Sequence, residues 1–216
     1  MPSWRVQHHS GEVGVFHARD IPPDHRTATF FRADSPTLVL GSSQRRESVD
    51  DGVASQLGVE VVRRRSGGGG VLLWPDEFVW LDLEIPASDA LWSNDIGRSM
   101  WWVGELWRAV LADSEPRATV HQGRMQRTRW SSDVCFAGTG PGEVLVDSAK
   151  LVGISQRRIR EAARFQTMVH LRWRPEVVAS LVADKPPVAD LIPIAKTAAA
   201  SADDIIAGLT AALHRL

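Results

Sequence analysis

The run Arg63–Gly70 constrains this chain more than any other feature, because it places four consecutive glycines after three arginines and a serine. It lies between two apolar segments with strand composition, Val59–Val62 and Val71–Leu73. Without Cβ atoms, the four glycines let the backbone turn tightly and approach a ligand closely. Successive amide N–H groups in such a loop form a concave anion site. The run predicts a ligand-binding loop between two strands; the alternative is a flexible basic loop.

Two familiar nucleotide loops do not match this run. A Walker loop requires Gly-Lys-Ser/Thr, which does not follow here. A dinucleotide fingerprint opens a helix, whereas the next segment, Val71–Leu73, has strand composition. Arg63, Arg64 and Arg65 supply charge for a carboxylate or phosphate. Because strand side chains alternate between faces, only some of the three are expected to face the site.

A second candidate segment is Lys150–Arg158, a lysine that opens an apolar strand with Gly153 three residues further on. An ammonium group there suits a bound acyl carbonyl or phosphate, because it stabilises developing negative charge. The alternative is a surface lysine in a hairpin, since lysines are mostly exposed.

The remaining pattern predicts an α+β fold, because strands outnumber helices and lie mostly in hairpins. Residues 1 to 34 are expected to form two strand-like pieces around the breaker Ile21–Asp24. Further strands are expected at Thr37–Leu40, Phe78–Ile85, Glu143–Asp147, Lys150–Gln156 and Phe165–Trp173. Helices are expected at Ser48–Leu57, Asp95–Leu111, Pro175–Val182 and Ala202–Leu216. One domain is expected over residues 1–216.

Composition excludes several classes of protein. The 25 basic and 26 acidic residues nearly cancel, which argues against binding of nucleic acid or membrane through charge. A single cysteine, Cys135, excludes an internal disulfide framework. No secretory signal is recognised, and the apolar runs are too short to cross a bilayer. A cytoplasmic enzyme is expected.

Together the motifs resemble the catalytic domain of the biotin/lipoate protein ligase superfamily, on its lipoate-protein ligase A-like side. The glycine run with its arginines resembles that family's substrate loop, and Lys150–Arg158 resembles its lysine motif. Leu40–Gln44 resembles the Gly-x-x-Gln segment upstream of the loop. The three landmarks follow the family's order.

The resemblance implies a mixed, largely antiparallel sheet with flanking helices, and an elongated pocket for an acyl chain. It implies that Arg64, Ser66, Gly67, Gly68, Gly69 and Gly70 line the acyl and phosphate side. Lys150 would contact the acyl carbonyl, with Gly153 beside it. In such ligases, lipoate and ATP form lipoyl-adenylate, which an acceptor lysine attacks. The C-terminal accessory domain of some ligases is not expected in this chain.

The sequence departs from the family at two positions. Where the family has a His-Asp-x-Gly-Asn run after the glycine loop, this chain has Leu73–Glu77, which puts the ATP-dependent reaction in doubt. The acidic residue seven positions before the lysine is Glu143 instead of the usual Asp. Glu143 is the candidate Mg²⁺ ligand, and a structural carboxylate is the alternative.

Cys135 suggests a different reaction. Octanoyltransferases of the same superfamily carry a nucleophilic cysteine in a similar loop at similar spacing from the lysine. A thiolate there would accept octanoyl from an acyl-carrier thioester and pass it on without ATP. The alternative is a space-filling cysteine, since Val134 and Phe136 flank it with apolar bulk.

The sequence therefore leaves three candidate functions. The first is a lipoate-protein ligase that uses ATP and Mg²⁺; the second is a cofactor-free transferase that uses Cys135. The third is a non-catalytic acyl- or adenylate-binding homologue. The expected partner is a lipoyl carrier domain of the 2-oxoacid dehydrogenase E2 or glycine cleavage H protein type, with lipoate or octanoate as the acid. The sequence leaves the acid open.

Overall fold

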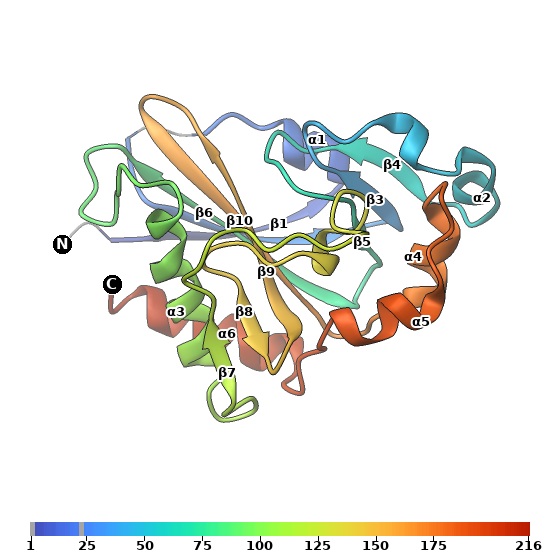
Figure 1. Ribbon diagram of the computed structural model, residues 1–216. Coiled ribbons are helices and arrows are strands. Elements are labelled where there is room, and N and C mark those ends of the chain that lie inside the picture. Colours follow the sequence, from blue (N-terminus) through green and yellow to red (C-terminus); the bar gives the residue numbers. More distant parts are fainter. Residues whose placement is uncertain (1–2, 22–23) are drawn as a thin grey trace.

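The computed structural model describes residues 3–21 and 24–216 (Figure 1). Its main element is a seven-stranded sheet in the order β1-β2-β6-β10-β9-β8-β7. Its strands are β1 (Arg5–Gly11), β2 (Thr27–Ala33), β6 (Phe78–Pro86), β7 (Ala118–Val120), β8 (Val144–Val146), β9 (Ala149–Arg158) and β10 (Ala162–His170). The described pairs are antiparallel, apart from parallel β1 and β2.

A second, three-stranded sheet carries the glycine loop. Its order is β4-β3-β5, with β3 (Thr37–Leu40) parallel to β4 (Glu60–Arg63) and antiparallel to β5 (Val71–Leu73). The α+β class and the mixed, largely antiparallel sheet predicted from the sequence are thereby confirmed.

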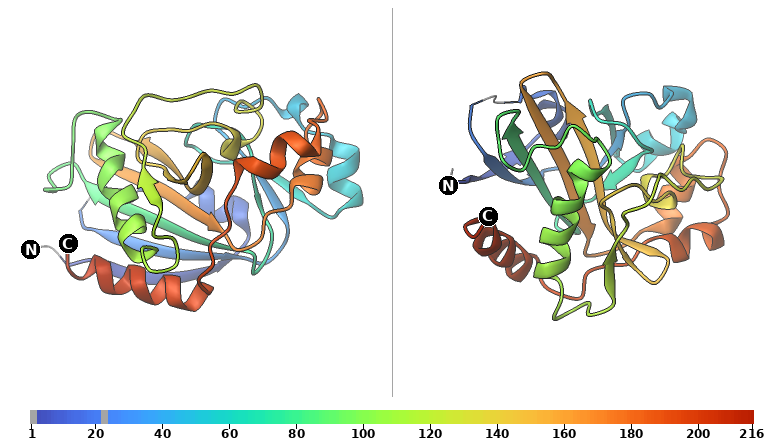
Figure 2. Two further views of the ribbon diagram at one scale, coloured as in Figure 1. Left: turned by 60° about the horizontal axis from the view of Figure 1, so that its bottom comes forward. Right: turned by 60° about the vertical axis from the view of Figure 1, so that its left-hand side comes forward.

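The helices lie on both sides of this arrangement. They are α1 (Val13–Ala18), α2 (Asp51–Gln56), α3 (Trp101–Val110), α4 (Pro175–Leu181), α5 (Val188–Leu191) and α6 (Ala202–Leu213). Helices α3 and α6 contact each other and pack on one face of the large sheet, as Figures 1 and 2 show. The small sheet and α1 pack against the opposite face, and α2, α4 and α5 cover the small sheet from outside.

Alternation along β6 and β10 separates an apolar face from a polar one. Leu81, Leu83 and Phe165 face α3 and α6, in a core centred on Trp107. The opposite face carries apolar side chains such as Trp80 and Met168, but also polar ones that are buried, including Asp82. Since burying a charge without a partner is costly, this face requires internal ion pairs.

Arg164 supplies these pairs. Its guanidinium lies 2.6 Å from Glu84 and 3.6 Å from Asp82, and Arg19 approaches Asp82 at 3.2 Å. Burial nevertheless raises the pKa of Asp82 to about 6, against the opposing effect of Arg164. The acids of β6 thus belong to a buried network.

Two predicted helices begin later than expected. Asp50 caps α2 by accepting a hydrogen bond from the Val53 amide at 3.0 Å, so the helix begins at Asp51 and not at Ser48. Helix α3 begins at Trp101 and not at Asp95, after a short 3₁₀ turn. Ile96, which falls inside the predicted helix Asp95–Leu111, therefore lies before α3 and is 61% exposed.

The N-terminal segment also differs from the prediction. The breaker residues Pro22 and Pro23 lie outside the described residues. Before them, a helix, α1, follows β1 where only strand-like structure was expected. Phe16 of α1 stacks on Phe31 of β2 with ring centroids 3.9 Å apart, so packing selects the helix. At the other end of the chain, α6 ends at Leu213 and not at Leu216.

No helix in the described part of the chain is both long enough and apolar enough to span a membrane.

We predict that replacing His170 with phenylalanine makes the protein less sensitive to acid. His170 packs between Phe136 and Trp173, with centroids 4.6 and 5.0 Å away. Burial lowers the pKa of His170 from 6.5 to about 3. As the pH falls, this histidine is therefore protonated in the unfolded chain before it is protonated in the folded protein. The free energy of unfolding decreases as the pH falls from 6.5 toward 3. The loss between pH 7 and pH 5 is roughly 2 kcal/mol, which urea unfolding measures.

Other buried groups do not distort this comparison. Burial also lowers the pKa of His17 to about 3, which adds to the acid sensitivity, whereas the raised pKa of Asp82 acts in the opposite direction. His17 and Asp82 both remain in the His170→Phe variant. Their contributions therefore cancel when the stability lost between the two pH values is compared for the two proteins. Equal loss of stability in the two proteins between the two pH values would contradict the prediction.

Candidate active site

Arg64 organises the glycine loop from inside. Its side chain is buried, and its guanidinium donates to the carbonyls of Gly67 (2.7 Å), Gly69 (2.9 Å) and Val39 (3.0 Å). Its Nε donates to the Ser66 hydroxyl at 3.1 Å. These contacts make Arg64 a residue that shapes the loop, and its expected contact with a ligand stays a prediction.

With Arg64 bound to the loop carbonyls, N–H groups of the glycine loop point away from the protein interior. The C=O and N–H of a trans peptide point in opposite directions, so the Gly68 N–H is directed away from Arg64 when the Gly67 carbonyl faces it. Within residues 3–21 and 24–216, the N–H groups of Gly67, Gly68 and Gly69 donate no hydrogen bond to the protein. Gly68 has φ +100°, which favours glycine. The loop therefore presents donors to a ligand.

The other two arginines of the run have different roles. Arg63 donates to the carbonyls of Gly41 and Gln44 and anchors the turn after β3. Arg65 pairs with Asp20 at the surface. The expectation that only some of the arginines turn inward agrees with this geometry.

Lys150, at the start of β9, is buried beside Glu143. Its Nζ lies 2.8 Å from the Glu143 carboxylate and donates to the Cys135 carbonyl at 2.7 Å. Glu143 also accepts from the backbone amides of Gly140 (2.6 Å) and Ile154 (3.2 Å). Because each is held from several sides, the pair fixes the Cys135 segment against β9.

Cys135 begins a short 3₁₀ turn (Cys135–Ala137) opposite the glycine loop. Its backbone N–H donates to the Gly70 carbonyl at 2.9 Å, and the Gly70 N–H donates back to Asp133 at 2.8 Å. A Cβ atom on Gly68 would lie 3.6 Å from the Cys135 Sγ. Half-buried and therefore partly accessible, the thiol faces the glycine loop.

Two cavities meet at Cys135. An outer one of about 230 Å³ is lined by the glycine loop, Cys135, Lys150 and Glu143. A narrow inner one of about 10 Å³ is mostly apolar. Its side chains come from β5, β6, β9, β10 and the 3₁₀ turn, and include Val71, Trp80, Phe136, Ile154 and Met168. The thiol thus lies where a polar mouth meets an apolar pocket.

The sequence motifs did not identify several residues of this site. Gln166 of β10 accepts from Ser66 at 2.7 Å and contacts His17 at 3.0 Å, linking the glycine loop to the buried network. Ile96 and Met125 are exposed and line the outer cavity. Gln166 belongs to no recognised sequence motif. Ile96 was missed because it fell inside the helix predicted at Asp95–Leu111, which begins only at Trp101.

The residues at Leu73–Glu77 fit a nucleotide poorly. Leu73 is buried in β5, and Arg174 lies over Trp74 at 4.4 Å. Glu77 binds Arg174 through two hydrogen bonds of 2.6 Å. The polar groups here are therefore paired within the protein.

Glu143 offers little to a metal. Both of its carboxylate oxygens accept from protein donors, so Mg²⁺ would compete with Lys150. No cluster of three or more His, Cys, Asp or Glu suited to a metal occurs in the described residues. The metal role of Glu143 stays a prediction.

We predict that Gly69→Ala lowers activity far more than Gly67→Ala. A Cβ on Gly69 would lie 2.9 Å from backbone atoms of Val134 and Cys135, whereas one on Gly67 would meet nothing within 4 Å. If Cys135 is the nucleophile, as one reading of the sequence predicts, displacing its thiol by about 1 Å costs on the order of a hundredfold in rate. Steady-state kinetics of both variants measure the difference. Equal activities would show that the loop tolerates this displacement.

The fold and the site, with a glycine loop, a buried lysine and an apolar pocket on a mixed sheet, are those expected for biotin/lipoate ligases and related acyltransferases. Residues 13–189 match the sequence profile of the lipoyl protein ligase A/B catalytic domain, and the chain belongs to this family. It is accordingly an enzyme of the lipoyl ligase or lipoyl/octanoyl transferase type.

Octanoyltransferase LipM of Kyrpidia tusciae is 28% identical to the chain over an alignment of 199 residues, and the match covers 84% of this chain and 71% of the relative. Among solved structures, a bi-partite lipoate protein ligase from Thermoplasma acidophilum, studied with its E2 lipoyl domain, superposes with a TM-score of 0.72 at 13% identity. The match covers 100% of this chain and 84% of that one.

A lipoate-protein ligase A bound with ATP gives a TM-score of 0.69 at 15% identity, covering 99% of this chain and 84% of the other. At such low identity, the two structural likenesses establish the shared fold.

Proposed function

We propose that this chain transfers an octanoyl or lipoyl group from a thioester donor to a lysine of a lipoyl carrier domain, with Cys135 as the nucleophile. The observation that carries the proposal is the position of the Cys135 thiol, between the glycine loop and the Lys150 segment, where the outer cavity meets the apolar pocket. The similarity to an octanoyltransferase supports it.

The reaction needs two acyl transfers. In the first, the Cys135 thiolate attacks the carbonyl carbon of the donor; a bond to Sγ forms, the bond to the donor sulfur breaks, and the donor leaves as a thiol after taking up a proton. In the second, the amine of the acceptor lysine attacks the Cys135 thioester. An amide bond forms, the bond to Sγ breaks, and the amine loses a proton.

The surrounding residues suit these steps. The side chains that line the narrow inner pocket, among them Trp80 and Met168, would move apart to admit the acyl chain and then pack against it. The inward-held Arg64 leaves the loop N–H groups for the oxyanion that forms in each transfer. The ammonium of Lys150, also on the outer cavity, would stabilise the Cys135 thiolate. None of these steps requires a metal or a nucleotide.

The acceptor is proposed to be a lipoyl carrier domain of the E2 or H protein type. Three exposed arginines, Arg124, Arg127 and Arg129, lie on the loop beside the outer cavity. Such a loop suits an acidic surface around the acceptor lysine. One catalytic domain over residues 1–216 would carry out this reaction.

An ATP-dependent lipoate ligase, the function first expected from the sequence, is the second candidate. The intact glycine loop and Lys150 favour it. The paired side chains of Leu73–Glu77 and the occupied carboxylate of Glu143 count against it. The third function considered from the sequence, a non-catalytic homologue, disagrees with the family of the chain and with the one cavity that Cys135, Lys150 and the loop line together.

Intact-mass analysis of an apo lipoyl domain separates the candidates. One sample contains the enzyme with an octanoyl thioester and no ATP; the other contains octanoate with ATP and Mg²⁺. The proposal predicts acylation in the first sample alone. Acylation in the second sample alone would contradict it and favour the ligase.

A further inference from the structure

The inner pocket follows a row of residues that crosses three strands of the large sheet. Gly153 of β9 pairs with Met168 of β10, and Met168 pairs in turn with Trp80 of β6. All three residues line this pocket. Since neighbouring strands lie about 5 Å apart, Trp80 is about 10 Å from Gly153. The pocket therefore extends across the sheet, away from β9.

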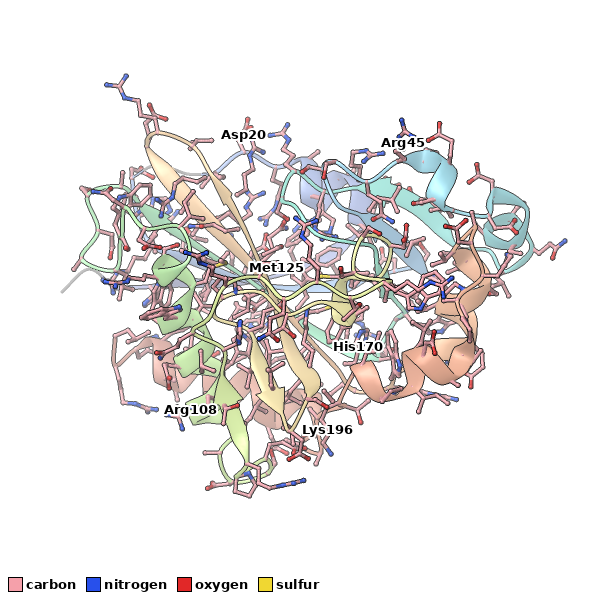
Figure 3. All side chains as sticks on the ribbon, viewed as in Figure 1. Asp20, Arg45, Arg108, Met125, His170 and Lys196 are labelled. Carbon is pink, nitrogen blue, oxygen red and sulfur yellow. The ribbon has the colours of Figure 1, made fainter. Side chains whose placement is uncertain are left out.

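Cys135 lies at the β9 end of this row. The ring of the next residue, Phe136, packs on Gly153, where an added Cβ atom would lie 3.2 Å from the ring. Cys135 also lines the outer cavity, together with the exposed Met125 (Figure 3). An acyl chain attached to the Cys135 thiol would therefore enter at β9 and run along the row toward Trp80.

The indole of Trp80 is held in place by buried neighbours. Its Nε1 donates a hydrogen bond to the Asp82 carboxylate at 2.7 Å, and the His17 ring packs at 74° to it with centroids 5.1 Å apart. Arg19 donates to the other carboxylate oxygen of Asp82 at 3.2 Å. Trp80, Asp82 and His17 are all buried. The indole therefore cannot be displaced without breaking a buried hydrogen bond.

Met168, in the middle of the row, is the more adaptable side chain. It is unbranched, and methionine fills gaps of varied shape through its three rotatable bonds. The polar residues beside it in the pocket, Ser155 and Gln166, hydrogen-bond to Ser66 at 3.0 and 2.7 Å. Movement of Met168, and not of the anchored Trp80, would therefore open the pocket to an acyl chain.

We infer that Trp80 is the end wall of the acyl pocket and sets the longest acyl chain that the enzyme accepts, with Asp82 as a positioning residue that holds the indole. The inference rests on the proposed transferase function and concerns its choice of acid. Octanoyl and lipoyl groups have carbon chains of the same length, so one end wall suits both. A longer chain would have to displace the indole from Asp82 and His17, which costs binding free energy.

Acyl thioesters that differ only in chain length test the end wall. We expect the kcat/KM of the wild type to fall steeply beyond the octanoyl donor. Trp80→Leu should raise the ratio of the dodecanoyl to the octanoyl kcat/KM by at least about tenfold, because a single methylene in an apolar pocket changes selectivity by about ten- to two-hundredfold. Trp80→Phe keeps an aromatic ring and should give a smaller shift in the same direction, which serves as the test if the leucine variant does not fold.

Trp102→Leu is the matched control for the loss of an indole. Trp102 packs against Phe165 on the opposite face of the sheet, with ring centroids 5.4 Å apart. This variant should keep the wild-type ratio of dodecanoyl to octanoyl kcat/KM. A wild-type ratio in the folded Trp80 variants, or a wild type that accepts both donors equally well, would overturn the inference.

A second pair of variants tests the role of Asp82. Asp82→Ala removes the acceptor of the indole N–H and should raise the same ratio by roughly fivefold, although Trp80 itself is unchanged. Glu84→Ala removes another buried carboxylate of β6, which pairs with Arg164 at 2.6 Å, and should keep the wild-type ratio. Equal ratios in the two variants would show that Asp82 does not position the end wall.

Calorimetric binding of octanoic, decanoic and dodecanoic acid to the Cys135→Ser variant requires no turnover. Affinity that falls beyond octanoate, and that extends to dodecanoate when Trp80→Leu is added, supports the end wall even where no transfer occurs and the proposed function fails. Affinity that rises steadily with chain length in both proteins, or no binding of any of the three acids, would overturn the inference.

Discussion

Replacing Cys135 with serine is expected to reduce octanoyl transfer from a thioester by at least about a thousandfold. A serine hydroxyl at this position has no general base arranged to activate it, because Lys150 is held by Glu143 and the Cys135 carbonyl. Serine fits the same space, so the fold and the pockets on either side should be retained. Transfer to an apo lipoyl domain, followed by mass spectrometry, measures the loss.

The same variant distinguishes the two candidate reactions. An ATP-dependent ligase activates the free acid through its phosphate and does not need the thiol, so Cys135→Ser would leave ligation intact. Thermal unfolding of the variant should match the wild type. A variant that is folded and retains most of its thioester-dependent transfer would remove Cys135 from the mechanism.

Replacing Lys150 with alanine is expected to abolish transfer and to lower the free energy of unfolding by about 3–5 kcal/mol. Lys150 and Glu143 are each less than a tenth exposed and form a pair 2.8 Å apart. Removing the lysine leaves the Glu143 carboxylate buried without its counter-ion and releases the Cys135 carbonyl. Urea unfolding at neutral pH measures the first effect, and the transfer assay measures the second.

A double variant separates structure from chemistry. Lys150→Met with Glu143→Gln removes both charges but keeps the side-chain volumes, and buried pairs are often replaced in this way at little cost. We expect most of the lost stability to return while transfer stays absent. Wild-type stability in Lys150→Ala would contradict the buried pair, and active transfer in the double variant would contradict the role of Lys150.

The local pattern of the sequence predicted the elements that form the site. Strands at Thr37–Leu40 and Val71–Leu73 occur with the predicted bounds, because short apolar runs closed by glycine or proline have few alternatives. The glycine loop between β4 and β5 was also predicted, and two of its positions require glycine: Gly68 has φ +100°, and a Cβ on Gly69 would lie 2.9 Å from backbone atoms. The inward orientation of Arg64, however, depends on its hydrogen bond to the Val39 carbonyl, which no local sequence pattern predicts.

Other parts of the site depend on packing between distant segments. Helix α1 contains Gly14 and β-branched residues, which favour other structures, and the stacking of Phe16 on Phe31 outweighs that preference. A polar cavity beside the site is lined in part by Arg45 and Arg127, which are separated by four strands in the chain. Gln166 was likewise missed, because its partners Ser66 and His17 lie far away in the sequence.

The mass of the enzyme itself, after exposure to an octanoyl thioester without acceptor, tests the proposed mechanism most directly. If Cys135 is the nucleophile, the protein gains the mass of one octanoyl group, peptide mapping places it on Cys135, and hydroxylamine removes it. Adding the apo lipoyl domain should then discharge the adduct onto the acceptor lysine, and Cys135→Ser should form none. An unmodified enzyme that still acylates the acceptor would show that no acyl-cysteine forms, and would contradict the proposed mechanism.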